Sequence, residues 1–109
     1  MSPETERIRA LNDAFRTTLQ GGKFVVTATI KTLPLSVQLA AFKALKDFST
    51  FPEDDDPENE HDFGSFEIAG ETFFWKIDYY DLSMEFGSEN PADPTSTTRV
   101  LTFMLAEDY

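Results

Sequence analysis

Apolar residues at helical spacing mark the start of the chain. The stripe consists of Ile8, Leu11, Phe15 and Leu19. Repeats of three and four residues are typical of a helix that buries one face. Ser2 stands where an N-cap belongs, and Pro3 where a first helical residue loses no hydrogen bond. We therefore predict a helix over Pro3–Leu19, ended by Gly21-Gly22 because glycine tolerates the left-handed conformation of a helix C-terminus.

Alternation between apolar and polar residues predicts the strands. Lys23–Lys31 alternates in this way, and Ser65–Ala69 and Glu71–Tyr80 form a pair joined tightly at Ala69-Gly70. One face of the second strand of the pair carries Phe73, Trp75, Ile77 and Tyr79. Aromatic rings on its other face as well indicate a central strand that is partly covered on both sides. We expect Ser83–Phe86 to be a further short strand.

Two more helices are predicted. One runs from Pro34 or Ser36 to about Ser49 and points its apolar residues inward. These inward residues are Val37, Ala41, Ala44, Leu45 and Phe48. The final stretch, PTSTTRVLTFMLAEDY, fits the period of a helix and that of a strand. Its length, and Asp93 as an N-cap before Pro94, favour a helix.

The sum of these elements is one α+β domain over residues 1–109. We expect a small, mostly antiparallel sheet of about four strands with about three helices. The 40% apolar content suffices for one core, which at this length removes roughly two-thirds of the unfolded surface from water. No cysteine is present, which excludes disulfides, thiolate nucleophiles and iron–sulfur clusters. The sequence shows no apolar run like that of a signal peptide and no apolar stretch long enough to cross a bilayer. We therefore expect a cytoplasmic protein that binds no membrane.

Charge divides the chain into unlike parts. Residues 1–46 hold seven Lys and Arg against three Asp and Glu, whereas residues 47–109 hold two against seventeen. The balance is therefore +4 in the first part and −15 in the second. Repulsion from phosphates argues against direct nucleic-acid binding by the acidic part, and its natural partner is a protein with a basic surface. A homodimer in which the basic part of one copy meets the acidic part of another remains an alternative.

The acidic loop, residues 51–64 (FPEDDDPENEHDFG), carries the only histidine. Aligned with a calcium-binding EF-hand loop, it places His61 at the position where a glycine makes the sharp turn, and Glu67, the last ligand, in a predicted strand. The spacing therefore predicts no specific metal site and no cofactor. The candidate ligands, if a cation bound, are Glu60, His61 and Asp62.

An enzyme centred on His61 is the alternative function, either metal-dependent or acting on a small ligand. Its imidazole would serve as a general acid or base tuned by Glu60 or Asp62. The other interpretation is a loop or cap histidine beside carboxylates. The chain has no G-x-S-x-G motif and no Gly-rich phosphate loop, so we expect no catalytic residue and a non-enzymatic protein.

Tyr79 and Tyr80 are candidates for an interface, where a ring is buried and its hydroxyl stays in water. Base stacking on this strand is opposed by the neighbouring carboxylates of Asp78, Asp81 and Glu85. Carboxylates that project at the charge spacing of a duplex, about 1.7 Å per charge along its axis, compete for a nucleic-acid-binding surface. An acidic adaptor whose charge only maintains solubility is the third alternative. The predicted partner-binding residues are Glu53, Asp54, Asp55, Asp56, Glu58, Glu60, Asp62, Asp78, Tyr79, Tyr80, Asp81 and Glu85.

The phrases FWKIDYYD, PADP and RVLTFMLAEDY are distinctive. Together with the sequence from Arg7 to Tyr109, they resemble an uncharacterised bacterial family, a domain of unknown function common in alphaproteobacteria and on their plasmids and other mobile elements. The resemblance implies no activity or catalytic residue. Small proteins of mobile elements are often antagonists of host defence, although many are passengers. The leading hypothesis is a small DNA-mimicking inhibitor of a nucleic-acid-binding defence protein, of the anti-CRISPR or anti-restriction type.

Overall fold

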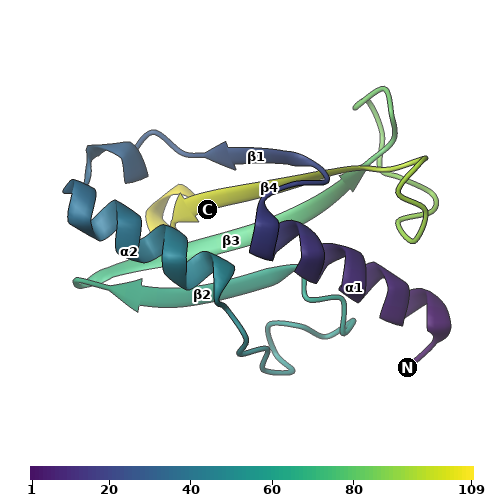
Figure 1. The fold of residues 1–109 in the computed structure, drawn as a ribbon, viewed down its shortest axis with the longest axis horizontal. Helices are drawn as coiled ribbons and strands as arrows, with labels where there is room; N and C mark the ends of the chain where they lie inside the picture. The colour runs from purple at the N-terminus through teal and green to yellow at the C-terminus, as the bar shows by residue number, and fades with distance from the viewer.

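A four-stranded sheet with two α-helices on one face forms the protein, an α+β domain (Figure 1). The computed structural model describes residues 1–109. Two short 3₁₀ helices, η1 and η2, complete it. In chain order the elements are α1 (Pro3–Thr18), β1 (Lys23–Val26), η1 (Ile30–Thr32), α2 (Leu35–Lys46), β2 (Phe63–Ile68), β3 (Glu71–Tyr80), β4 (Thr98–Leu105) and η2 (Ala106–Asp108).

The sheet is mixed, with strand order β1-β4-β3-β2. The β2–β3 and β3–β4 pairs are antiparallel, and β1 runs parallel to β4. β3 lies between β2 and β4, as the rings on both of its faces predicted. The predicted β2–β3 turn is confirmed: Ala69 and Gly70 both have positive φ, 54° and 80°, as a tight two-residue hairpin requires.

The predicted C-terminal helix is wrong, because this segment is the inner strand β4. Leu101 and Phe103 pair with Ile77 and Trp75 of β3 on the core face. Met104 on the opposite face is also buried, so apolar residues stand on both sides of this strand and imitate a helical pattern. Asp93 is not an N-cap either, since its carboxylate accepts a hydrogen bond from Thr95 N at 2.9 Å within a turn.

Two strand predictions are also corrected. Ser83–Phe86 is a turn, and pairing there is limited to a single bridge between Tyr80 and Gly87. The strand expected over Lys23–Lys31 ends at Val26, because the chain then bends into η1, which buries Ile30 completely.

The first two of the three predicted helices, α1 and α2, have almost the expected bounds. Ser2 Oγ accepts a hydrogen bond from Thr5 N at 3.1 Å, which confirms the N-cap of α1. Its C-terminus differs from expectation: Leu19, not a glycine, takes the left-handed conformation, with φ 60°. Gly22 serves another purpose, since a Cβ there would lie 2.4 Å from the carbonyl oxygen of Arg99.

The core fills the space between the sheet and the two helices. Its fully buried large apolar side chains are Phe15, Ile30, Leu45, Phe73, Trp75, Leu101 and Phe103. Phe73 and Phe103 stack with centroids 5.5 Å apart, which joins β3 to β4. Neither α-helix covers the opposite face of the sheet, where Phe74 contacts Phe63 and Tyr109. None of the helices has the length and apolar character of a bilayer span.

Candidate binding surface

A buried hydrogen-bond network joins α1 to the sheet and to the acidic loop. Asn12 is completely buried. Its Nδ2 donates to the carbonyl of Glu60 at 2.9 Å and to the Tyr79 hydroxyl at 2.8 Å, and its Oδ1 accepts from Arg99 Nε at 2.8 Å. The Tyr79 hydroxyl in turn donates to Glu60 Oε1 at 2.7 Å. One amide therefore holds three separate segments together.

The charge state of this network follows from its burial. Burial, and the hydrogen bond to Glu60, raise the pKa of the Tyr79 phenol far above its usual value. The phenol stays protonated and remains a donor to the carboxylate. The Arg99 guanidinium lies 5.1 Å from the Tyr79 ring centroid. Burial lowers the pKa of Arg99, and attraction to Tyr79 and Glu60 opposes that change.

His61 is a second tie between the acidic loop and α1. Its Nδ1 lies 2.9 Å from Asp13 Oδ1, and its backbone N–H donates to Asp56 Oδ1 at 3.0 Å. The other ring nitrogen lies 3.7 Å from Asp56 Oδ2. The imidazole also stacks on Phe51 with centroids 3.6 Å apart and planes 3° from parallel. All these contacts position the loop.

Arg16 of α1 contacts residues at the start of the acidic loop and just before it. It is 3% exposed. Its Nη1 lies 3.1 Å from Asp13 Oδ1, and its Nη2 donates to the carbonyl of Phe48 at 2.9 Å. The guanidinium also lies over the rings of Phe51 and Trp75. The two ends of the acidic loop are thus attached to α1 by separate contacts, through Arg16 at its start and His61 at its end.

The acidic loop consequently has an inner and an outer set of side chains. Asp56 is 3% exposed and faces inward. Asp62 is half-buried, and burial, followed by repulsion from other carboxylates including Glu60, raises its pKa to about 6. The outer set, exposed to solvent, consists of Glu53, Asp54, Asp55 and Glu58.

The remaining predicted contacts form a second group. Asp78 and Tyr80 lie on the open face of the sheet, where Asp78 forms an ion pair with Lys76 at 3.1 Å. Asp81 and Glu85 lie in the β3–β4 connection. Figure 1 shows this connection and the acidic loop on opposite sides of α1. The predicted partner-binding residues therefore form two surfaces, while Asp56 and Tyr79 face the interior.

Comparison with known proteins gives one match. The model of a protein family described as a protein of unknown function, DUF3768, matches residues 26–108. The chain belongs to the DUF3768 family. The expected membership of a domain of unknown function is thereby confirmed. No curated protein and no solved structure matches this chain.

The family match begins at the end of β1 and so leaves α1 outside it. In this DUF3768 protein α1 nevertheless supplies Asn12, Asp13 and Arg16 to the contacts described above. Sequence reasoning missed these three polar residues, of which Asn12 and Arg16 are buried. A usable signal was their spacing, because Asn12 and Arg16 follow Ile8 at successive intervals of four and share its helical face.

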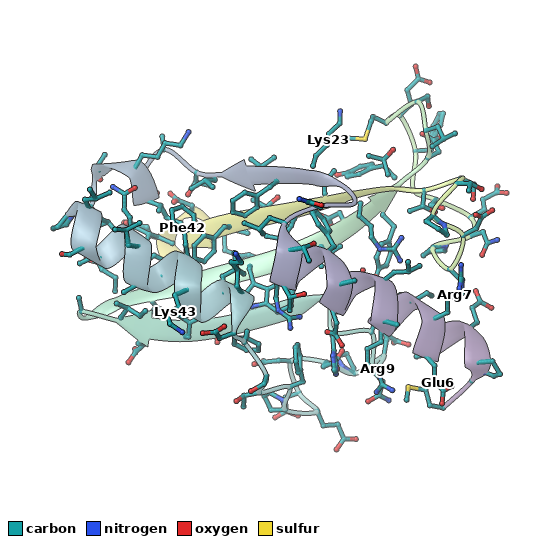
Figure 2. All side chains as sticks on the ribbon, in the orientation of Figure 1. Glu6, Arg7, Arg9, Lys23, Phe42 and Lys43 are labelled. Carbon is teal, nitrogen blue, oxygen red and sulfur yellow. The ribbon has the colours of Figure 1, made fainter.

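Basic side chains of this DUF3768 protein spread over the N-terminal elements. Figure 2 shows Arg7 and Arg9 on α1, Lys23 at the start of β1 and Lys43 on α2. Arg7 Nε donates to the carbonyl of Ala92 at 2.7 Å, which attaches α1 to the β3–β4 connection. These labelled cations therefore lie on three elements, α1, β1 and α2.

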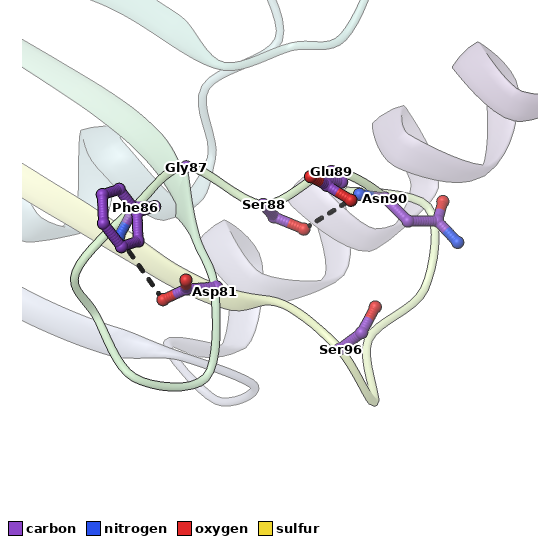
Figure 3. Close-up of a pocket in the computed structure, with 7 residues that line it drawn as sticks. All are labelled: Asp81, Phe86, Gly87, Ser88, Glu89, Asn90 and Ser96. Carbon is purple, nitrogen blue, oxygen red and sulfur yellow. Dashed lines mark hydrogen bonds between the residues drawn. The ribbon is translucent and has the colours of Figure 1, made fainter.

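Two cavities open on the surface, and neither borders His61. One, of about 400 Å³, lies on the open sheet face between Lys76, Thr102 and Tyr109. The other, of about 470 Å³, lies in the β3–β4 connection (Figure 3). No three side chains of His, Asp or Glu converge in an arrangement that holds a metal ion.

Proposed function

We propose that this DUF3768 protein is a small acidic, non-enzymatic binding protein that covers the basic, nucleic-acid-binding surface of a partner protein. The observation that carries the proposal is the attachment of the acidic loop. Asp56 and His61 face inward: Asp56 accepts from the backbone N–H of His61, and the His61 ring contacts Asp13 of α1. Glu53, Asp54 and Asp55 project into solvent. Carboxylates on a firm support lose little conformational freedom on binding.

Charge density supports this choice of partner. Three consecutive carboxylates, Glu53 to Asp55, are followed by Glu58 on the same loop. A nucleic-acid-binding surface is adapted to one negative charge per about 1.7 Å of duplex axis, and a dense row of carboxylates attracts the same lysines and arginines. Complementary charge also accelerates encounter between the two proteins. The sequence resemblance implies a mobile-element context. A host-defence nuclease fits that context and also has a basic, nucleic-acid-binding surface, so it is the partner class that we propose.

The test begins with capture of partners by the tagged protein from a bacterial lysate at low salt. Proteins released at about 0.5 M NaCl, where exposed charges are screened, are identified and purified. Binding of each one to a labelled DNA duplex is then measured with and without the DUF3768 protein. We expect the duplex and the DUF3768 protein to exclude one another, with the competition weakening steeply as salt rises.

Two variants with the same net charge make the test specific. The first neutralises the outer set: Glu53→Gln, Asp54→Asn, Asp55→Asn and Glu58→Gln. The control neutralises four exposed carboxylates elsewhere: Glu4→Gln, Glu6→Gln, Glu67→Gln and Glu107→Gln. We expect the first variant to lose about tenfold or more in affinity and the control much less, because contact charges act more strongly than distant ones. Equal losses, or simultaneous binding of the partner to duplex and protein, contradict the proposal.

A further inference from the structure

The second surface contains a cavity beside an exposed aromatic ring, in the turn that follows β3. We propose that this cavity is the contact at which the DUF3768 protein receives an arginine side chain of its partner. The choice of a basic partner rests on the proposed function; the cavity itself is a separate observation. It has a volume of about 470 Å³ and lies between Asp81, Phe86, Ser88, Glu89 and Asn90 (Figure 3).

Phe86 is an unusual residue for this chain. It is 70% exposed, and it is the single phenylalanine among the large apolar side chains that lie mostly in solvent, although the sequence contains eleven. Leu82, in the same turn, is 66% exposed. Exposed aromatic residues on a fixed backbone are typical of the anchors that dominate protein interfaces.

The backbone beneath Phe86 is fixed by hydrogen bonds within the turn. Asp81 Oδ1 accepts from Ser83 Oγ at 2.7 Å and from Glu85 N at 3.2 Å. The amide of Asp81 donates to the carbonyl of Phe86 at 2.8 Å, which closes the turn. Its far end returns to β3, because Ser88 N donates to the carbonyl of Tyr79 at 3.0 Å. The backbone that carries the ring is therefore ordered before a partner arrives, which lowers the entropic cost of binding.

The chemistry of the cavity selects a cation that also has a flat apolar surface. The carboxylates of Asp81 and Glu89 border it, and no lysine or arginine does. Ser88 Oγ is already engaged, since it accepts from Asn90 N at 3.1 Å and contacts Thr97 Oγ1. A guanidinium stacks on an aromatic ring while its N–H groups donate to carboxylates, whereas a lysine ammonium or a metal ion makes less use of the ring.

The experiment uses the intact protein, labelled with nitrogen-15, and a five-residue peptide, acetyl-Gly-Gly-Arg-Gly-Gly-amide. The comparison peptide replaces arginine by citrulline, which has the same shape without the charge. In a low-salt NMR titration we expect the arginine peptide to shift the amide signals of Phe86, Gly87 and Glu89 with a millimolar Kd. The citrulline peptide should bind at least about fivefold more weakly, because charge supplies much of a weak exposed contact.

Phe86→Ala and Leu82→Ala form a matched pair of variants. Both replace a side chain that lies mostly in solvent, so both should fold. Phe86 borders the cavity and Leu82 does not. We therefore expect Phe86→Ala to weaken arginine binding about fivefold or more and Leu82→Ala to leave it unchanged.

Three results would overturn the assignment: equal shifts with both peptides, shifts confined to the acidic loop, or the same pattern with calcium chloride alone. Failure here is distinguishable from failure of the proposed function. If the peptide does not bind but duplex competition persists, the cavity assignment falls and the proposed function stands. If the peptide binds at Phe86 but no partner competes with the duplex, the cavity is shown to bind arginine and the proposed function falls.

Discussion

Two arginines act as interior residues of this protein. Arg16 and Arg99 are each 3% exposed. Each guanidinium donates to backbone or side-chain oxygens and lies over aromatic rings, Arg16 over Trp75 and Arg99 over Tyr79. Burial of a charge requires such compensation, because desolvation of the ion is otherwise very costly. Both side chains connect separate segments, and their loss leaves buried acceptors without partners.

Asn12→Ala is the most direct test of the network. The change removes hydrogen bonds to Glu60, Tyr79 and Arg99 and leaves their polar atoms buried. We expect the free energy of unfolding in urea to fall by about 2–4 kcal/mol, since each unsatisfied buried group costs about 1–3 kcal/mol. Gln20→Ala, at an exposed position, is the control. A loss below about 0.5 kcal/mol, the range of a surface substitution, would show that the network contributes little.

Asp62 makes stability depend on pH. Its pKa is about 6 in the folded protein and has an ordinary value of 3.8. Between these values the folded state binds the proton more tightly, so this residue makes stability fall as pH rises through the window, and the penalty persists above it. Asp62→Asn should therefore stabilise the protein at about pH 7.5 and give little gain at about pH 4.

Thermal unfolding at the two pH values measures this effect, with Asp54→Asn on the exposed part of the loop as the control. A gain from Asp62→Asn that is the same at both pH values would point to altered packing. Loss of stability at neutral pH would contradict the assigned direction of the shift.

The acidic loop is attached to α1 through His61. His61 contacts Asp13 of α1, receives support from Phe51, and has its backbone held by Asp56. We expect His61→Ala to accelerate hydrogen exchange at residues 53–60 by about tenfold, because loss of a hydrogen bond to a charged group costs about 1.5–3 kcal/mol locally. Exchange in β3 and β4 should change much less.

Glu58→Ala, in the same loop but exposed, is the control for that measurement. Equal acceleration throughout the domain would mean that His61 supports the whole fold and not this loop. Unchanged exchange would remove the firm support on which the proposed function relies.

Secondary-structure prediction succeeded where one face of an element is apolar and the other polar. The two α-helices meet this condition, and the β2–β3 hairpin is marked instead by its tight turn at Ala69-Gly70. β4 does not meet the condition, because it is an inner strand with Leu101 facing the helices and Met104 buried on the other face. A strand that is buried on both sides has no period of two, so its sequence does not distinguish it from a buried helix.

The whole molecule is strongly anionic, and repulsion among its like charges lowers the stability of the folded state. Its net charge is −11. Neutralising the outer set of four loop carboxylates reduces the net charge to −7. We expect this variant to be more stable than the parent by about 0.5–1 kcal/mol at low salt, and equal to it at about 0.5 M NaCl, where repulsion is screened.

Thermal unfolding at both salt concentrations measures the difference. The control variant with Glu4, Glu6, Glu67 and Glu107 neutralised has the same net charge, but two of these carboxylates lie in the first turn of α1 and favour the helix dipole. We expect a smaller gain from it. A loss of stability in the loop variant would show that those carboxylates serve the fold and not a partner.

The sequence by itself determined the class of the domain, the two helices, the β2–β3 hairpin and the separation of charge, because each depends on residues close together in the chain. Only the tertiary structure decided the parallel pairing of β1 with β4 and the roles of Asn12, Asp56 and Tyr79. These depend on contacts between segments distant in the sequence. The position of the acidic residues is another such case. They belong to one acidic half of the sequence, but the acidic loop and the β3–β4 connection lie on opposite sides of α1, and a local sequence pattern does not predict where a helix packs.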